Sequence, residues 1–268
     1  MHEIIIQIIL GIIQGITEWL PVSSSGMTTL LMSNFFGITD ISKLIHMALF
    51  LHLGTFFAAL IYLRKDVWSL TKALFNYRKA GQTTKKTLNF LVIATLLSGI
   101  LGLIILKLLT SLPETLNFPR KTITGFVGVL LLLTGIIQIK VREKDLRQLR
   151  ELKNSDGVWL GFAQGLASLL GLSRSGITVS TLLLKKFDDT TALRLSFLMS
   201  LPIVLLGNII LNFSDFTQVV TSASLYGLLA SFVFGLLTIT GLIKLSKKIN
   251  FGWFVLIFAL LILGSLWL

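Results

Sequence analysis

Two stretches of this chain, 150 residues apart, repeat one pattern of glycine and polar residues within long apolar runs. The first, GIIQGITEWLPVSSSGMT, covers residues 11–28, and the second, GFAQGLASLLGLSRSGIT, covers residues 161–178. They agree at Gly11/Gly161, Gln14/Gln164, Gly15/Gly165, Leu20/Leu170, Ser23/Ser173, Ser25/Ser175, Gly26/Gly176 and Thr28/Thr178. Seven of these eight matches are glycine or polar residues, which an apolar composition does not readily produce by chance. The pattern indicates that a polar cluster was duplicated.

The composition places this duplication in a membrane protein. Hydrophobic residues make up 54% of the chain and charged residues 13%, whereas about a quarter of a soluble domain is charged. Without cysteine, the chain has no disulfide and no thiolate metal site. Residues 1–3 lack the basic region of a cleaved signal. The net charge of +12 comes from short loops between apolar runs, which favours a role in topology and anionic lipid contact over nucleic-acid binding.

The apolar runs predict an all-α integral membrane fold with six transmembrane helices and two re-entrant helical hairpins. A spanning helix needs about 20 mostly apolar residues. The runs that fit are 45–63, 88–110, 121–140, 193–212, 223–243 and 251–268. Each duplicated stretch instead stops at its Ser/Gly cluster and continues in a segment too short to span, 27–36 or 177–184. Gly26 and Gly176 suit the turn of each hairpin, because glycine accepts unusual backbone angles.

Charge supports this topology. If loop 64–86 is cytoplasmic, so are 140–156, 185–194 and 244–250, and these four segments hold 19 of the 24 lysine and arginine residues. This bias obeys the positive-inside rule and places both termini outside the plasma membrane. An alternative remains open in which residues 4–20 form a full span.

The repeats are predicted to be inverted. Three full spans separate the two copies, and an odd number inserts the second copy upside down relative to the first. Repeat one covers about 1–113 and repeat two about 157–268 of a single membrane domain, 1–268, with an additional span at about 121–140. Inverted repeats with interrupted helices mark a site near the bilayer midplane, so the serines of both stretches are expected to meet.

The two copies differ in their charged residues. The first has Glu18 and Ser24 where the second has Ser168 and Arg174. Charges inside a membrane are costly and usually functional. One alternative is a structural Glu18–Arg174 ion pair that holds the repeats together, although buried pairs are often poor stabilisers.

The polar side chains around Arg174 predict an anion site. Arginine offers a planar fork of donors that suits phosphate oxygens, and a helix that begins near Gly176 would aim free N–H groups at the same point. Serine and threonine hydroxyls add further donors. The candidate substrate-binding residues are Ser23, Ser25, Gly26, Thr28, Ser173, Ser175, Gly176 and Thr178. For any single hydroxyl, helix–helix packing is the alternative interpretation.

Glu18 indicates chemistry beyond anion binding, because a carboxylate repels a bound phosphate unless a metal bridges them or the carboxylate acts as a base. Gln14 lies one turn earlier on the same helical face, so both can ligate one hard cation such as Mg²⁺ or Ca²⁺. A serine nucleophile needs such a base or metal. His46 and His52 are six residues apart and face different sides of their helix. Hydrogen-bonded packing is the favoured interpretation for both, with His52 a minor candidate for the site.

At these residues the chain resembles the bacitracin-resistance family of undecaprenyl pyrophosphate phosphatases, BacA/UppP. That family carries an (E/Q)xxxE motif, then LPVSS, and a second motif SRSxxT, which read here QGITE at 14–18, LPVSS at 20–24 and SRSGIT at 173–178. The resemblance covers the whole chain in span order. It implies six spans with two re-entrant hairpins in inverted repeats and a site facing outside. It also implies metal-dependent hydrolysis of a polyprenyl diphosphate, which recycles the carrier lipid for cell-envelope synthesis.

The resemblance also assigns roles: Glu18 is the motif carboxylate, Ser24 a nucleophile or phosphate donor, and Arg174 the diphosphate clamp. Two positions depart from the family pattern. Met27 stands where members commonly have a histidine, and Leu170-Gly171 replaces Pro-Gly. Because methionine cannot act as a base, a lipid-phosphate transporter or flippase that binds without hydrolysis is the alternative function. The sequence leaves open the prenyl chain length, the metal, and whether serine or water attacks. It also leaves open the assembly, for which a homodimer is one option.

Overall fold

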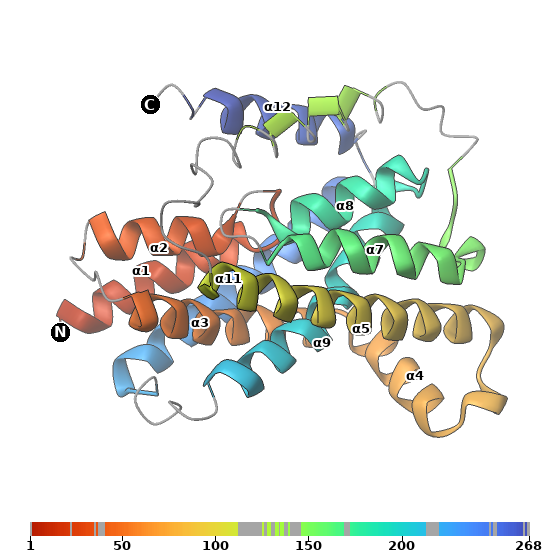
Figure 1. Cartoon of the computed structure of the whole chain (residues 1–268), viewed down its shortest axis with the longest axis horizontal. Helices are drawn as coiled ribbons and strands as arrows, with labels where there is room; N and C mark the ends of the chain where they lie inside the picture. The colour runs from red at the N-terminus through yellow and green to blue at the C-terminus, as the bar shows by residue number, and fades with distance from the viewer. Residues whose placement is uncertain are drawn as a thin grey trace. The chain divides into compact units, whose positions relative to one another are not determined.

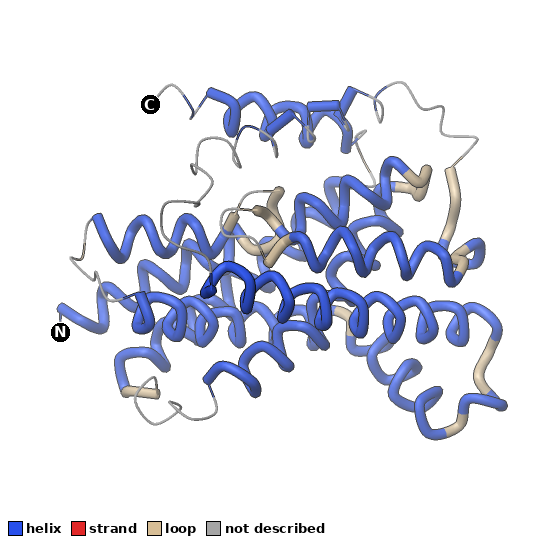
Figure 2. The backbone as a smooth tube through the Cα atoms, viewed as in Figure 1, coloured by secondary structure: helices blue, strands red, loops and turns tan. Residues whose placement is uncertain are grey.

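The chain is described here by a computed structural model (Figure 1). The described residues are 2–21, 23–34, 36, 41–111, 146–168, 172–212, 220–246, 248, 251–264 and 266, with scattered positions between 125 and 139. Helix makes up almost all of this part of the chain, which holds no β-strand (Figure 2), so the predicted all-α class is confirmed. The predicted span 121–140 falls outside the described residues except at those scattered positions, as do Val22, Leu170 and Gly171.

The helices follow one another with short connections. Their bounds are α1 His2–Thr17, α2 Ser24–Asn34, α3 Ile41–Tyr62, α4 Arg64–Phe75, η1 Tyr77–Lys79, α5 Gln82–Ser111, η4 Leu149–Glu151, α7 Asn154–Leu166, α8 Arg174–Leu184, α9 Asp189–Asn212, α11 Ser222–Ser246 and α12 Phe251–Gly264. The predicted hairpins therefore correspond to α1–α2 and α7–α8, which are pairs of helices of 11 to 16 residues.

Several helices are long and apolar enough to cross a membrane. Among the described residues these are Gln82–Ile105, Asp189–Ile210 and Ser222–Ser246, and α3 with α4 adds a fourth if the two helices form one broken span. They coincide with the predicted runs 88–110, 193–212, 223–243 and 45–63. The segment Val255–Gly264 of α12 is apolar but shorter. The chain is a multi-pass α-helical membrane protein.

The chain divides into two compact units, each containing one of the duplicated stretches. Unit 1 consists of residues 1–64 and 200–242, and unit 2 of residues 65–199 and 243–268. In unit 1, helices α1, α2 and α3 pack around a core of Leu10, Met32, Ala48 and Leu51. Burial of these side chains fixes the α1–α2 hairpin against α3.

Glycines on α1 and α3 let these two helices of unit 1 approach α11 closely. A Cβ atom on Gly15 of α1 would lie 2.7 Å from the Ser231 carbonyl oxygen and the Gly235 amide nitrogen, and one on Gly54 of α3 would lie 2.6 Å from the Leu228 carbonyl oxygen. The indole N–H of buried Trp19 donates to the Gly235 carbonyl over 3.0 Å. Close backbone approach at small residues is a common way to pack membrane helices.

The corresponding glycines of the second stretch also allow close helix packing, in unit 2. Helix α7 packs along α5 (Figure 1). A Cβ atom on Gly161 would lie 2.7 Å from Leu97 Cβ, and one on Gly165 would lie 2.8 Å from Leu101 Cβ. The duplicated glycines are therefore helix-packing positions in both copies, and this role explains why they match.

A buried ion cluster closes the basic end of the α7–α8 hairpin. The Arg147 guanidinium donates to Asp156 Oδ2 over 2.7 Å, and the Lys185 ammonium lies 3.1 Å from Asp156 Oδ1. The Lys153 N–H donates to the same carboxylate over 2.9 Å. Burial raises the pKa of Asp156, but these hydrogen bonds outweigh it and hold the pKa below its usual value. The cluster ties the start of α7 to the residue that follows α8.

Candidate functional site

The first duplicated stretch gathers three polar groups around one carboxylate oxygen at the end of α1. Ser24 Oγ donates to Glu18 Oε2 over 2.7 Å, and Gln14 Nε2 donates to the same oxygen over 2.8 Å. Glu18, Ser24 and Gln14 are all buried. The Glu18 N–H also donates to the Gln14 carbonyl over 3.0 Å. This helical bond brings the two side chains onto one face, as their spacing predicts.

The third group is His52 of α3. Its Nε2 lies 3.2 Å from Glu18 Oε2, and its Nδ1 lies 2.6 Å from the Ala48 carbonyl oxygen. A carbonyl only accepts hydrogen bonds, so Nδ1 carries a proton. Nε2 and a carboxylate oxygen then approach each other only with a second proton between them. Glu18 and His52 therefore share a proton, so His52, the minor candidate from the sequence, contacts the motif carboxylate as well as the Ala48 carbonyl.

The sequence points to His52 only weakly, because its partner Glu18 is distant in the chain. The local signal is the short run HLGT that His52 opens inside an apolar span. Met27, at the position where the resembling family commonly has a histidine, is exposed. An imidazole nevertheless reaches the motif carboxylate, from α3 rather than from α2.

The donor atoms beside Glu18 fit a hard cation. Gln14 Oε1 is buried and accepts no hydrogen bond from the described part of the chain. A buried carbonyl-type oxygen without a donor is costly unless a ligand satisfies it. Mg²⁺ is typically held by one or two protein oxygens together with substrate phosphates. The described residues contain no group of three or more His, Cys, Asp or Glu side chains that could hold a metal alone.

The first turn of α2 presents a set of hydroxyl groups. Ser23 Oγ accepts a hydrogen bond from the Gly26 N–H over 3.2 Å and lies 3.5 Å from Ser25 Oγ. Thr28 Oγ1 donates to the Ser24 carbonyl over 3.0 Å. Ser23 therefore acts as an N-cap in the usual manner of serine.

The second stretch repeats these hydrogen bonds position by position. Ser173 Oγ accepts from the Gly176 N–H over 3.1 Å and lies 3.2 Å from Ser175 Oγ. Thr178 Oγ1 donates to the Arg174 carbonyl over 2.8 Å. The duplicated residues thus build the same helix start twice, which supports the sequence evidence for duplication.

The glycines of these clusters have another role than the predicted one. Helix α2 begins at Ser24 and α8 at Arg174, so Gly26 and Gly176 lie within the first turn of each helix and not at the turn of the hairpin. A Cβ atom on Gly26 would lie 3.0 Å from Ser23 Oγ. Glycine leaves room for the capping serine, and the prediction that these two residues form the turn was wrong.

Arg174 is held at the first position of α8. Its Nη1 donates to the Ser196 carbonyl of α9 over 3.4 Å, and the Ser196 hydroxyl lies 2.7 Å from Thr178 Oγ1. Ser196, which is fully buried, was missed by the sequence interpretation, although a serine inside the apolar run 193–212 is the signal that could have found it. These contacts fix the start of α8 against α9.

The predicted site residues thus fall into two groups, one in each unit. The group in unit 1 consists of Gln14, Glu18, Ser23, Ser24, Ser25, Gly26 and Thr28. The group in unit 2 consists of Ser173, Arg174, Ser175, Gly176 and Thr178. Chemically, the first group together with His52 links the Ser24 hydroxyl, the Glu18 carboxylate and an imidazole. This is the arrangement of an activated nucleophile and its base. The second joins a guanidinium to hydroxyls and a helix N-terminus, which suits a phosphate.

Comparison with known proteins relates the chain to one family. The family described as bacitracin resistance protein BacA matches residues 7–265. A protein of Methanococcoides burtonii named undecaprenyl-diphosphatase is 42% identical over 251 residues, which are 92% of each chain. Proteins of the same name from Haloarcula marismortui and Saccharolobus islandicus are 35% and 37% identical, over 94% and 87% of this chain and 93% and 83% of theirs.

These relatives align over nearly their whole length, and the family match contains every residue of both polar clusters. The chain belongs to the BacA bacitracin-resistance family.

Proposed function

We propose that this chain is an undecaprenyl-diphosphatase, which hydrolyses a polyprenyl diphosphate in the membrane to the monophosphate and phosphate. The observation that carries the proposal is the hydrogen-bonded series Ser24–Glu18–His52 in a member of this family. The relatives named undecaprenyl-diphosphatase support the substrate. Transport without hydrolysis gains no support from them, because each is named for hydrolysis.

In the proposed reaction, Ser24 Oγ attacks the terminal phosphorus while its proton passes to Glu18. The bond to the bridging oxygen breaks, and the polyprenyl monophosphate leaves. Water then hydrolyses the phosphoserine and releases phosphate. The 2.7 Å hydrogen bond from Ser24 to Glu18 supports serine over water as the first nucleophile. His52 orients the carboxylate and shares its proton.

Arg174 and the hydroxyls of Ser173, Ser175 and Thr178 are proposed to bind the diphosphate. The duplication of the stretch, with three predicted spans between its copies, supports a proposal in which both clusters serve one substrate. Phosphoryl transfer depends mainly on positioning and charge neutralisation, and these donors supply both. Ser23, Ser25, Gly26 and Thr28 extend the donor set at the start of α2.

A divalent cation is part of the proposal. Glu18 and the unpartnered oxygen of Gln14 would hold Mg²⁺ or Ca²⁺, which would neutralise charge on the diphosphate. The proposed topology has six spans and two re-entrant hairpins, with both termini and the site toward the outside of the plasma membrane. The bias of lysine and arginine toward loops 64–86, 140–156, 185–194 and 244–250 supports it.

Ser24→Ala tests the proposed nucleophile. We expect release of phosphate from a long-chain polyprenyl diphosphate to fall at least about 10³-fold in the purified variant, because the attacking oxygen is gone. Ser231→Ala is the matched control, since Ser231 is also buried in unit 1 and its hydroxyl donates only to the Leu51 carbonyl in the described contacts. Activity in Ser24→Ala equal to that of the control would overturn the assignment.

A further inference from the structure

Helix α4 has a face with exposed aromatic and basic side chains. Trp68 and Phe75 are seven residues apart, so they share this face, and 63% and 83% of their surfaces are exposed. Arg64, Lys65 and Lys72 are exposed beside them. Lys72 Nζ lies 4.9 Å from the centre of the Trp68 ring. Aromatic and basic side chains together on an exposed helix face are typical of a helix at a membrane surface.

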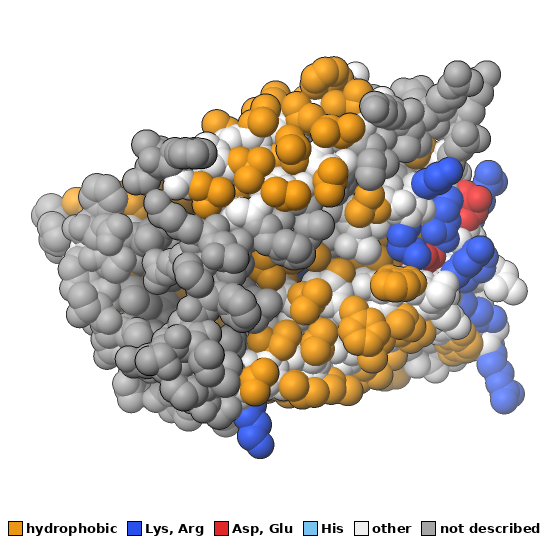
Figure 3. All heavy atoms as spheres, turned by 45° about the horizontal axis from the view of Figure 1, so that its top comes forward, with side chains coloured by type: hydrophobic (Ala, Val, Ile, Leu, Met, Phe, Trp, Pro, Cys, Tyr) orange, Lys and Arg blue, Asp and Glu red, His pale blue; other side chains and the backbone are white. Residues whose placement is uncertain are grey.

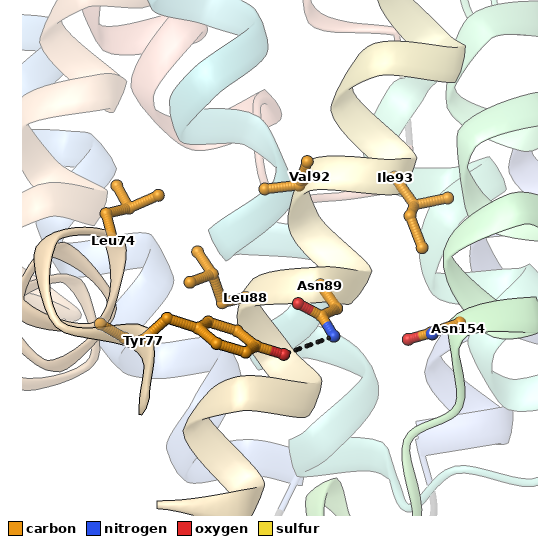
Figure 4. A pocket seen from close by; sticks show the side chains of 8 residues that line it. Leu74, Tyr77, Leu88, Asn89, Val92, Ile93 and Asn154 are labelled. Carbon is orange, nitrogen blue, oxygen red and sulfur yellow. Dashed lines mark hydrogen bonds between the residues drawn. The ribbon is translucent and has the colours of Figure 1, made fainter. Parts of the chain in front are cut away.

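A pocket of about 390 Å³ lies next to this helix, at the start of the spanning helix α5. Leu74, Leu88 and Val92 line its apolar part, and Tyr77, Asn89 and Asn154 its polar part (Figure 4). Asn89 Nδ2 donates to the Tyr77 hydroxyl over 2.9 Å. Because that hydroxyl accepts this bond, its own proton is available to an acceptor in the pocket.

The depth of the pocket matches the boundary between lipid headgroups and acyl chains. The candidate spanning part of α5 begins at Gln82, and a helix rises about 1.5 Å per residue. Leu88 and Val92 therefore lie roughly 9 and 15 Å along the helix from its start, at the beginning of the apolar run 88–110. The 24 residues of this part are about 36 Å long, slightly more than the hydrocarbon core of a bilayer. An acyl chain can reach the leucine and valine while its headgroup stays near Tyr77.

The charge around the pocket selects an anionic headgroup. Residues 64–86 contain seven lysine or arginine residues and one acid, Asp66, and Asp66 is paired with Arg194 of α9. Lys85 Nζ lies 5.5 Å from the centre of the Tyr77 ring and donates to the Arg78 carbonyl over 3.0 Å. Figure 3 shows most of the visible lysine and arginine side chains gathered on one side, beside apolar surface.

We propose that this pocket binds an anionic phospholipid from the leaflet on the basic side of the protein. Lys85 and Arg78 contact the phosphate, Tyr77 donates to a headgroup oxygen, and an acyl chain lies along Leu74, Leu88 and Val92. The Asp66–Arg194 ion pair joins α4 to α9. The site is separate from both polar clusters and does not depend on the proposed phosphatase activity.

The test is native mass spectrometry of the purified full chain titrated with phosphatidylglycerol or phosphatidylcholine. We expect the chain to bind phosphatidylglycerol about tenfold more tightly, and Lys85→Gln/Arg78→Gln to lose that preference. The matched control is Lys244→Gln/Lys248→Gln, which removes the same charge from exposed positions outside the segment 73–93 that supplies most of the pocket lining. If both variants lose the preference for phosphatidylglycerol equally, the effect of charge is nonspecific. If neither variant loses it, Lys85 and Arg78 do not contact the lipid. Either result would overturn the proposal.

Val92→Trp tests the apolar part independently. Val92 is 43% exposed, so the larger side chain fills the pocket without entering the core. We expect the occupancy of the tightest phosphatidylglycerol adduct to fall at least fivefold, with an unchanged melting temperature. An unchanged occupancy would contradict the assigned place of the acyl chain.

Discussion

Arg174→Ala is expected to lower phosphate release from a polyprenyl diphosphate by about 10³-fold, because a guanidinium that neutralises phosphate charge contributes on this scale in phosphoryl transfer. Arg174 lies at the first position of α8, and its Nη1 donates to the Ser196 carbonyl of α9. The melting temperature of the variant is measured alongside, so that a loss of folding is distinguished from a loss of phosphate binding. The measurement is kcat and KM for phosphate release, together with binding of the lipid diphosphate.

Arg174→Lys is the matched control for this prediction. Lysine keeps the positive charge but lacks the planar fork of donors, so we expect an intermediate activity, about 10- to 100-fold below the wild type. If Arg174→Ala releases phosphate at the wild-type rate, the second duplicated stretch does not bind the reacting phosphate, and the proposed division of roles fails.

Glu18→Gln is expected to lower kcat by about 10³-fold while KM stays within a fewfold of the wild type. Glutamine has the same shape as glutamate but cannot take the proton of Ser24. Because Glu18 Oε2 meets Ser24, Gln14 and His52, the change also alters the network that holds the serine. Steady-state kinetics at saturating lipid would separate the loss of turnover from a loss of binding.

His52→Gln provides a graded comparison for Glu18. His52 touches the carboxylate but not the serine in the described contacts, so it acts as a positioning residue, and we expect a smaller loss of about 10- to 100-fold. A Glu18 variant whose whole defect lies in KM would contradict the assignment of Glu18 as the base.

Local sequence relationships predicted much of the site. Gln14 and Glu18 meet because they are four residues apart on one helix, and Ser173 caps α8 because serine before a helix commonly does so. The duplication predicted that Ser23 and Ser173 would behave alike, and their hydrogen bonds do match. The all-helical membrane class followed from the lack of charge in the long apolar runs.

Contacts between distant segments could not be predicted in the same way. His52 reaches Glu18, and Ser196 reaches Thr178, because separate helices pack together at those places. A single sequence does not say which face of an apolar helix meets which neighbour. The glycines show the same limit: Gly15 and Gly165 match because each meets a particular helix at short range, whereas Gly26 leaves space for a capping serine.

The two copies have kept one scaffold and diverged in chemistry. Both start a helix with the same serine, glycine and threonine bonds, yet the first adds a carboxylate and the second a guanidinium. In the proposed reaction, the first copy supplies the reactive group and the second the binding group. The central claim is that the two together hydrolyse a lipid diphosphate with the help of a divalent cation.

The most direct test is release of phosphate by the purified wild-type chain from a C15 and a long-chain polyprenyl diphosphate, in Mg²⁺, Ca²⁺ or EDTA. The account predicts that, in Mg²⁺ or Ca²⁺, one phosphate is released for each polyprenyl monophosphate formed. In EDTA, at most a trace of phosphate is released. Tight binding of the lipid diphosphate without any release of phosphate in either metal would contradict it, and would show a pocket that binds the lipid but does not cleave it.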